Sequence, residues 1–256
     1  MYFSLGKTAL QMKQRTLLAF LFLTFALTAF GQNRLQVMSY NVRHCAGMDF
    51  VVDYDRTAAV INRVRPDAVA IQELDSMTGR SGRHDQLGEL AVRTQYHPVF
   101  AAAIDFNGGK YGVGILTRET PLSTRRIPLP GEEPRVLLVV ELEDYVIACT
   151  HLDLGEEQRL ASVPIIVAEA QRWKKPFILA GDWNDRPGSK LLQTMKEQFT
   201  ILSGDEYTFP ADAPSECIDY VAVFRSCHAK TLKSQVVNEP EASDHRPLAV
   251  KLKIKK

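Results

Sequence analysis

The chain has 256 residues, in which 31 Lys and Arg nearly balance 30 Asp and Glu for a formal net charge of +1. This balance argues against a protein that coats nucleic acid, since such proteins usually carry a clear basic excess, although a local basic cleft stays open. No linker, low-complexity stretch or block of like charges divides the chain. One well-buried domain is therefore expected.

The first predicted element is a secretory signal peptide over residues 1–31. Lys13 and Arg15 precede an apolar run over residues 17–30, and small residues lie near the polar Gln32. A basic start, a short apolar run and a small-residue cleavage site are typical of such signals. A bilayer span takes about 20 residues, so a retained anchor is the weaker alternative.

Cleavage at this point would leave a mature domain over residues 32–256. The segment removed holds Lys7, Lys13 and Arg15 and no acid, so the 31 basic residues fall to 28 against 30 acidic ones, a net charge of −2. The mature chain shows no second run apolar enough to span a membrane. We therefore expect an exported protein, and a monomer.

Apolar runs rich in Val and Ile, bounded by Gly, Pro, Asp or Asn, predict strands along the mature chain. They cover residues 35–40, 68–71, 113–116, 135–142, 145–149, 177–180, 218–224 and 248–254. Helical spacing of apolar residues marks 55–64 and 156–173, and Pro164 should kink the second helix or delay its start. Because helices and strands mix without strict alternation, a two-sheet sandwich with outer helices fits better than a doubly wound parallel sheet.

Polar side chains follow several of these strands directly. Asn41 follows the first, Gln72-Glu73 the second, His151 the fifth, and Asp182 and Asn184 the sixth. A strand end holds such a group rigidly at the rim of a sheet. The repetition indicates convergence on one cleft that could bind a metal or a phosphate.

Each of these groups also has a structural interpretation. Glu73 alone could be a solvated acid, and His151 alone an ordinary histidine at a strand end. In Gly181-Asp182-Trp183-Asn184, an extended chain would turn Asp182 and Asn184 to the same side, whereas an Asx turn would use the same residues.

An acid inside an apolar strand is the sharper signal. Asp219 lies in the run Ile218-Asp219-Tyr220, and a buried carboxylate is costly unless it is paired. The motif Ser243-Asp244-His245-Arg246-Pro247 offers a partner. An Asp behind an imidazole fixes its tautomer and raises its pKa, so we predict that Asp219 pairs with His245.

Four cysteines complete the inventory, none with the close paired spacing of a zinc site. Cys45, Cys217 and Cys227 leave disulfides undecided, with a bond between Cys217 and Cys227 conceivable. Cys149 lies in an apolar run and should pack as a small core residue.

Taken in order, these motifs resemble the series of the endonuclease/exonuclease/phosphatase superfamily. The matching segments are Ser39-Tyr40-Asn41, Gln72-Glu73, Thr150-His151-Leu152, Gly181-Asp182-Trp183-Asn184, Ile218-Asp219-Tyr220 and Ser243-Asp244-His245-Arg246-Pro247. The resemblance extends over almost the whole mature chain. It implies an α/β fold, a four-layer α/β/β/α sandwich of two mixed sheets with outer helices, and a metal-dependent phosphoric ester hydrolase with its active site at the sheet rims.

The resemblance also implies roles for individual residues. Glu73 would be the principal Mg²⁺ ligand, with Asn41 beside it and Asp244 completing the set, and Mn²⁺ would be a substitute metal. Asp182 would orient or deprotonate the attacking water, with Asn184 holding that geometry. His245, supported by Asp219, and His151 would bind the phosphate oxygens. The identity of the general base stays open.

Two arginines extend the expected site. Some family nucleases carry an acid two residues after the Asn, where this chain has Arg43, which suggests a phosphate contact instead of a second metal ligand. Arg135 resembles the arginine that opens a central strand in deoxyribonuclease-like members and touches substrate phosphate. A polar loop after the Glu73 strand, with Arg80, Arg83, His84 and Asp85, could hold substrate selectivity.

Three functions remain in competition. The favoured one is hydrolysis of a small or lipid-linked phosphodiester or phosphomonoester outside the cytoplasm. An extracellular nuclease is weakened by the acidic mature charge and by the lack of a long basic insertion. A catalytically inactive binding module is disfavoured because every expected catalytic position holds the expected chemical type.

Overall fold

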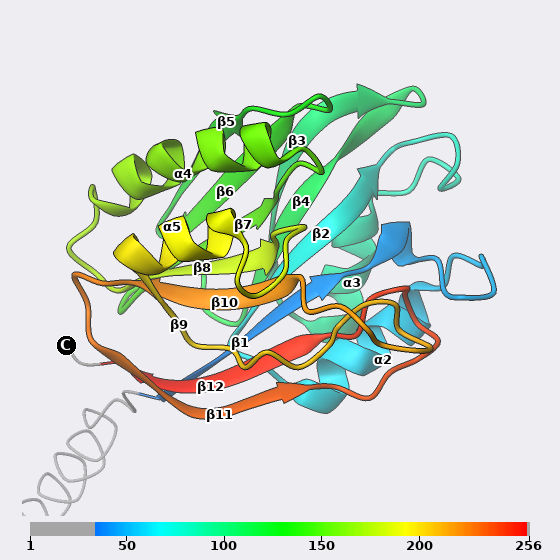
Figure 1. Ribbon diagram of the computed structural model, residues 1–256. Helices are drawn as coiled ribbons and strands as arrows, with labels where there is room; N and C mark the ends of the chain where they lie inside the picture. The colour runs from blue at the N-terminus through cyan, green and yellow to red at the C-terminus, as the bar shows by residue number, and fades with distance from the viewer. Residues whose placement is uncertain (1–33, 255–256) are drawn as a thin grey trace, which may run out of the picture. The chain divides into compact units, whose positions relative to one another are not determined.

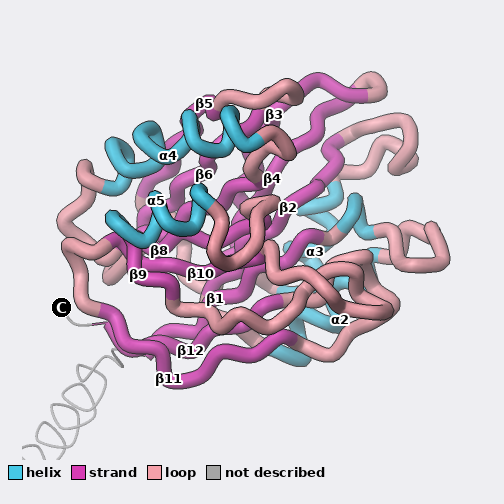
Figure 2. The backbone as a smooth tube through the Cα atoms, viewed as in Figure 1, coloured by secondary structure: helices cyan, strands magenta, loops and turns pink. Residues whose placement is uncertain are grey.

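The computed structural model describes residues 34–254, and the predicted signal peptide over residues 1–31 lies outside them. Two six-stranded mixed sheets face one another (Figures 1 and 2). The first has the strand order β11-β12-β1-β2-β4-β3 and the second β5-β6-β7-β8-β10-β9. Helices α2 and α3 pack on the first sheet, while α4 and α5 cover the second, so the four-layer α/β/β/α prediction is confirmed.

The first sheet consists of β1 (Arg34–Asn41), β2 (Ala68–Ser76), β3 (His97–Phe106), β4 (Gly109–Thr117), β11 (Ala229–Val236) and β12 (Leu248–Ile254). The second consists of β5 (Ser123–Leu129), β6 (Arg135–Glu141), β7 (Val146–His151), β8 (Phe177–Asp182), β9 (Phe199–Ile201) and β10 (Asp219–Phe224). The helices are η1 (Arg43–Cys45), α2 (Tyr54–Val64), α3 (Gln86–Thr94), α4 (Glu156–Ala170) and α5 (Lys190–Gln198).

Continuous apolar sequence accounts for the central strands of the second sheet. Strands β7, β8 and β10 are buried along their whole length, because one face meets the opposite sheet and the other meets α4 and α5. By contrast, β12 alternates, with Leu252 buried and Lys251 and Lys253 exposed. Burial between the sheets therefore fixes the register of the strands that carry the polar ends.

Local sequence sets the helix boundaries. The Asp53 carboxylate accepts a hydrogen bond from Arg56 N and begins α2, and Ser189 Oγ does the same for Leu192 N at α5. Helix α2 ends at Val64 and is capped by Arg65, whose left-handed φ of 53° closes the last turn. Helix α4 begins at Glu156 and contains Pro164, so of the two predicted effects of this proline the delayed start is excluded, while the kink stays a prediction.

The described residues show the state of the cysteines and the character of the helices. All four cysteines are free, so Cys217 and Cys227 form no disulfide. Cys149 is fully buried between the sheets, as predicted. Within residues 34–254, no helix combines the length and the apolar character needed to cross a bilayer.

Candidate active site

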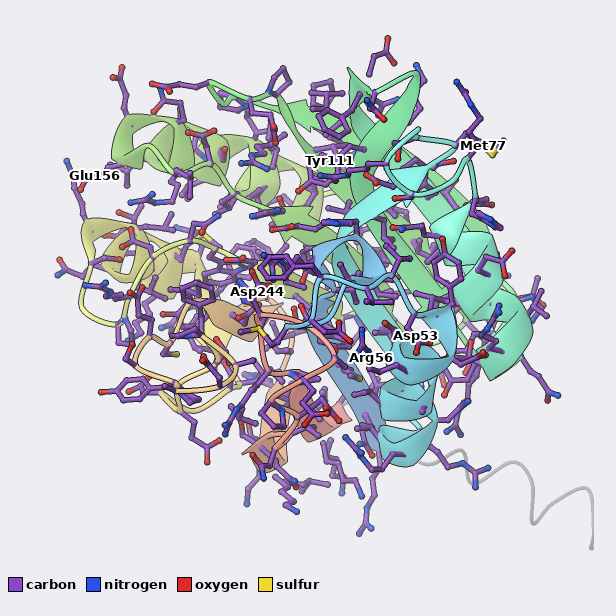
Figure 3. The ribbon with its side chains drawn as sticks, turned by 90° about the vertical axis from the view of Figure 1, so that its right-hand side faces the viewer. Asp53, Arg56, Met77, Tyr111, Glu156 and Asp244 are labelled. Atoms are coloured by element: carbon purple, nitrogen blue, oxygen red, sulfur yellow. The ribbon has the colours of Figure 1, made fainter. Side chains whose placement is uncertain are left out.

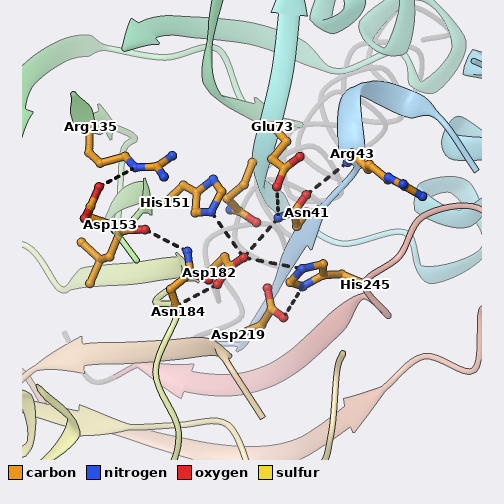
Figure 4. Close-up of polar contacts among 12 residues, drawn as sticks. Asn41, Arg43, Glu73, Arg135, His151, Asp153, Asp182, Asn184, Asp219 and His245 are labelled. Carbon is orange, nitrogen blue, oxygen red and sulfur yellow. Dashed lines mark hydrogen bonds and ion pairs between the residues drawn. The ribbon is translucent and has the colours of Figure 1, made fainter. Parts of the chain in front are cut away.

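The strand register brings the predicted polar residues to one rim. Strands β1 and β2 are parallel and pair Asn41 with Gln72, so Glu73 lies beside the end of β1. In the second sheet, His151 pairs with Asp182, which pairs in turn with Asp219 on β10. The two rims lie on the same side of the molecule and their side chains meet (Figure 4).

Glu73 lies on a β-bulge. The pairing of β2 with β4 shifts register between Ile71 and Leu74, and Glu73 has a left-handed φ of 60°. A bulge re-aims a side chain, and a non-glycine residue with positive φ costs free energy that the surroundings must offset. The carboxylate is half-buried, and its Oε1 accepts a hydrogen bond of 2.9 Å from Asn41 Nδ2.

Asp182 lies at the centre of the cluster. Its Oδ2 is 3.1 Å from Asn41 Nδ2, 3.6 Å from His151 Nε2 and 3.7 Å from His245 Nε2. Burial raises the pKa of the Asp182 carboxyl, and the nearby charge of Asp219 raises it further. The charged form of Asp182 is thus disfavoured, and a nearby positive charge would stabilise it.

His245 and Asp219 form the pair that the sequence predicted. His245 Nδ1 lies 2.9 Å from Asp219 Oδ2, and both side chains are buried. Burial opposes the charged imidazolium, but the carboxylates of Asp219 and Asp182 outweigh it and raise the pKa of His245 to about 10. His151 behaves in the opposite way, because burial lowers its pKa to about 4. The two imidazoles therefore differ in charge near neutral pH.

Asp182, Asp219 and His245 each offer a ligand atom within 4.8 Å of the others, a spacing that could hold a metal ion. This group differs from the predicted set of Asn41, Glu73 and Asp244. In this group, His245 Nδ1 is already hydrogen-bonded to Asp219.

Asp244 lies at the edge of the cluster and is half-buried. The Ser243 hydroxyl donates to the Asn41 carbonyl oxygen at 2.8 Å, which ties the segment carrying Asp244 to the end of β1. Arg43 Nε is 3.5 Å from Asp244 Oδ2, and its guanidinium lies 4.6 Å from the centre of the Phe50 ring. In Figure 4 the Arg43 side chain extends away from Asp182.

Asn184 departs from the extended-chain expectation. Its φ is 51°, and its backbone N–H donates to Asp182 Oδ1 at 2.9 Å, which is an Asx turn. The side-chain Nδ2 donates to the Leu152 carbonyl oxygen at 2.9 Å. The residue therefore fixes one oxygen of Asp182 and links it to the segment after His151.

Arg135 opens β6, as expected, and is 9% exposed. Its Nη1 lies 3.0 Å from Glu133 Oε1, and its Nε is 3.8 Å from Asp153 Oδ2. That Nε is buried and has no hydrogen-bond partner within the described residues. The Asp153 carboxylate oxygen lies beyond hydrogen-bond distance of this buried donor.

Two neighbours of the site were not predicted. Asp153, buried beside Arg135, follows His151 by two residues, and the motif around His151 does not single it out. The second is Tyr111 on β4. Burial raises the pKa of the Tyr111 hydroxyl, and the negative charge of nearby Glu73 raises it further. Figure 3 shows Asp244 and Tyr111 on the face where β1 and β2 end. No sequence signal distinguishes Tyr111 from an ordinary strand residue.

The chain is similar to proteins of one known family. The model of the Endonuclease/Exonuclease/phosphatase family matches residues 38–245. An endonuclease/exonuclease/phosphatase from Beutenbergia cavernae is 24% identical, with a TM-score of 0.71 over 86% of this chain and 72% of its own. None of the curated proteins compared with the chain matches it.

Two further solved structures share the fold. A mannosyl-6-phosphatase from Bacteroides thetaiotaomicron is 18% identical, with a TM-score of 0.67 over 85% of this chain and 99% of its own. ANGEL2, a 2',3'-cyclic phosphatase, is 16% identical, with a TM-score of 0.69 over 87% and 96%. With the family match over most of its length, the chain belongs to the endonuclease/exonuclease/phosphatase family of phosphoester hydrolases.

Proposed function

We propose that this protein is an exported, Mg²⁺-dependent hydrolase that cleaves a phosphodiester or phosphomonoester of a small or lipid-linked substrate by in-line attack of water. The observation that carries the proposal is the position of Asp182. Its carboxylate lies between two imidazoles of opposite protonation preference and shares the Asn41 amide with Glu73. The site thus combines an acidic side with a phosphate-binding side.

The acidic side suits a hard cation. Glu73 and Asp244 are half-buried carboxylates at one rim, and Asn41 adds an amide next to them. Oxygen donors of this kind, together with waters and substrate oxygens, are the ligands that Mg²⁺ prefers. When bound, the ion would polarise a phosphoryl oxygen and neutralise charge that develops in the transition state. Asn41 would hold Glu73 in place by donating to its Oε1.

Asp182 would hold the attacking water. The Asx turn with Asn184 fixes Oδ1, and Asn41 donates to Oδ2, so the carboxylate has a single orientation. The raised pKa of this carboxyl makes it a better proton acceptor than an exposed Asp. Its Oδ2 would thus orient the water and accept its proton.

Three basic side chains would bind the phosphate. His245 stays protonated because Asp219 supports it, so its Nε2–H can donate to a non-bridging oxygen. Neutral His151 offers a second N–H, and the guanidinium of Arg135, which opens β6, would supply the third donor. Donors fixed before the reaction stabilise developing charge without reorganising.

Arg43 would bind a different part of the substrate. Its ion pair with Asp244 and its stacking on Phe50 turn it away from Asp182. We therefore assign Arg43 to a part of the substrate beyond the scissile phosphate, and Arg135 to that phosphate itself.

The substrate choice rests on charge and on the absence of a long basic insertion. The named activities of two structural neighbours, a mannosyl-6-phosphatase and a 2',3'-cyclic phosphatase, are phosphoester hydrolyses of different kinds. Export follows from the predicted signal peptide, and we propose a monomer. An extracellular nuclease on the same site is the second candidate, and nucleic acid is its test substrate.

The proposal is tested by assaying the purified protein on bis-p-nitrophenyl phosphate, p-nitrophenyl phosphate, sphingomyelin and plasmid DNA, with Mg²⁺ and with EDTA. Mg²⁺-dependent release from either nitrophenyl ester or from sphingomyelin supports the proposal. Cleavage of plasmid DNA alone would replace it with the nuclease. Binding of Mg²⁺ without hydrolysis of any of the four would contradict the substrate assignment.

A further inference from the structure

Two stretches of left-handed backbone flank the acidic side of the site. Arg43, His44 and Cys45, which follow Asn41, have φ values of 46°, 46° and 58°, and Glu73 has a φ of 60°. Residues with a Cβ rarely adopt this conformation, so each stretch persists only where neighbouring contacts hold it. Both stretches carry residues assigned above to the metal or the substrate.

One side chain bonds to the first stretch and to the backbone two residues after Glu73. Gln86 Oε1 accepts a hydrogen bond of 2.9 Å from Asp75 N, two residues after Glu73, while Nε2 donates to the His44 carbonyl oxygen at 2.7 Å. Nε2 also lies 3.1 Å from Ser81 Oγ in the polar loop. Gln86 is fully buried, as the first residue of α3.

The two hydrogen bonds of Gln86, called the Gln86 bridge below, add to a backbone hydrogen bond between the same segments. Val42 N donates to the Gln72 carbonyl oxygen at 3.2 Å, which joins the same two segments just before Glu73. The Gln86 bridge joins them just after it. Glu73, at the bulge where the ladder is interrupted, is therefore bracketed by two links to the end of β1.

We propose that Gln86 is a positioning residue that sets the distance between the Asn41–Arg43 end and Glu73, and through it the affinity for Mg²⁺. The inference rests on the proposed function. A primary amide suits the position because it has an acceptor and a donor at a fixed separation. Glutamate keeps the acceptor but faces the His44 carbonyl with a second oxygen, and leucine removes the side-chain partner of both backbone groups.

The test compares Gln86→Glu and Gln86→Leu with a control in the same helix. Thr94 is buried near the other end of α3, and its Oγ1 donates to the Leu90 carbonyl oxygen at 2.8 Å. Thr94→Val removes one buried hydrogen bond far from the bridge. Calorimetric titration with Mg²⁺ and thermal unfolding are measured for all three variants in the full chain.

We expect the dissociation constant for Mg²⁺ to rise by about tenfold in both Gln86 variants, the lower bound typical of residues that orient metal ligands, and to stay unchanged in Thr94→Val. Folded Gln86 variants with wild-type Mg²⁺ affinity, or equal weakening in Thr94→Val, would overturn the inference. Failure of both Gln86 variants to fold would overturn it as well, because Gln86 would then serve the fold as a whole. A wild-type protein that binds no Mg²⁺ would contradict the proposed function itself, and that titration separates the two failures.

Discussion

Asn41 and Asp182 lie 141 residues apart and on different sheets, yet Asn41 Nδ2 is 3.1 Å from Asp182 Oδ2. The same nitrogen lies 2.9 Å from Glu73 Oε1. One amide group thus supplies its two hydrogens to two carboxylates, one on the acidic side and one on the phosphate-binding side. The packing of the two sheets against each other is what brings the halves of the site together.

Replacing the Asn41 amide by a carboxylate should lower the stability of the substrate-free protein. In Asn41→Asp, three carboxylates would crowd together and two would lose their donor, and like charges at such distances resist ionisation. We expect a clearly lower melting temperature in EDTA, part of which Mg²⁺ restores. Asn62→Asp on the exposed face of α2 is the matched control. An unchanged melting temperature for Asn41→Asp in EDTA would show that the shared amide does not hold the site.

Asp182→Asn separates chemistry from folding. The variant keeps the shape of the side chain but cannot accept the proton of water, so kcat should fall by roughly 100-fold to 10,000-fold. Because burial destabilises this carboxylate, the metal-free variant should unfold at the wild-type temperature or above it. Kinetics and thermal unfolding of one preparation check both statements. Retained turnover, or loss of the folding transition, would argue against the role given to Asp182.

The pair of Asp219 and His245 predicts how stability depends on pH. The folded pKa of His245, about 10, exceeds its unfolded value near 6.5, so the pair stabilises fully below about pH 6.5 and less as pH rises toward 10. Asp219→Ala removes the partner and should cost about 3–5 kcal/mol at pH 6.5. Urea unfolding in EDTA between pH 6.5 and 9 should show the difference between wild type and variant shrinking. A difference that stays constant or grows with pH would exclude the pair as its origin.

We expect Arg159 to support both activity and stability, although it contacts no predicted site residue. This buried arginine, on α4, donates from Nη1 to the Asp153 carbonyl oxygen at 3.2 Å and from Nε to Asp185 Oδ2 at 3.2 Å. It thereby joins the segment after His151 to the segment after Asn184. We expect Arg159→Met to lower kcat/KM by about tenfold or more and to destabilise the fold. Arg172→Met is the control, because the Arg172 side chain is 60% exposed. Equal effects in the two variants would contradict a specific role of Arg159.

Continuous apolar runs made the central strands predictable, because burial between two layers demands them. The strands expected at 35–40, 135–142 and 177–180 correspond to β1, β6 and β8, with shifts of one or two residues at most. The edge strands β3, β5, β9 and β11, with most residues at least partly exposed, lack that signal and were missed. The helices α3 and α5 have only nine residues each, and their turns of apolar spacing are too few to stand out.

The site was more predictable in its members than in its contacts. An acid in an apolar strand identified the pair of Asp219 and His245, because burial leaves few alternatives. The Asx turn at Asn184 and the bulge at Glu73 depend on backbone conformations that the sequence does not encode locally. The orientation of Arg43 depends on Phe50 and Asp244, which approach it only in the folded chain.

The most direct test of the central claim is the Mg²⁺ dependence of bis-p-nitrophenyl phosphate hydrolysis by the wild type and by Glu73→Gln. EDTA should abolish turnover by the wild type, and Mg²⁺ should restore it. Glu73→Gln should need at least about tenfold more Mg²⁺ for half-maximal rate, because its principal carboxylate ligand is gone. Turnover that survives EDTA, or an unchanged Mg²⁺ requirement in Glu73→Gln, would contradict a metal-dependent site built on Glu73.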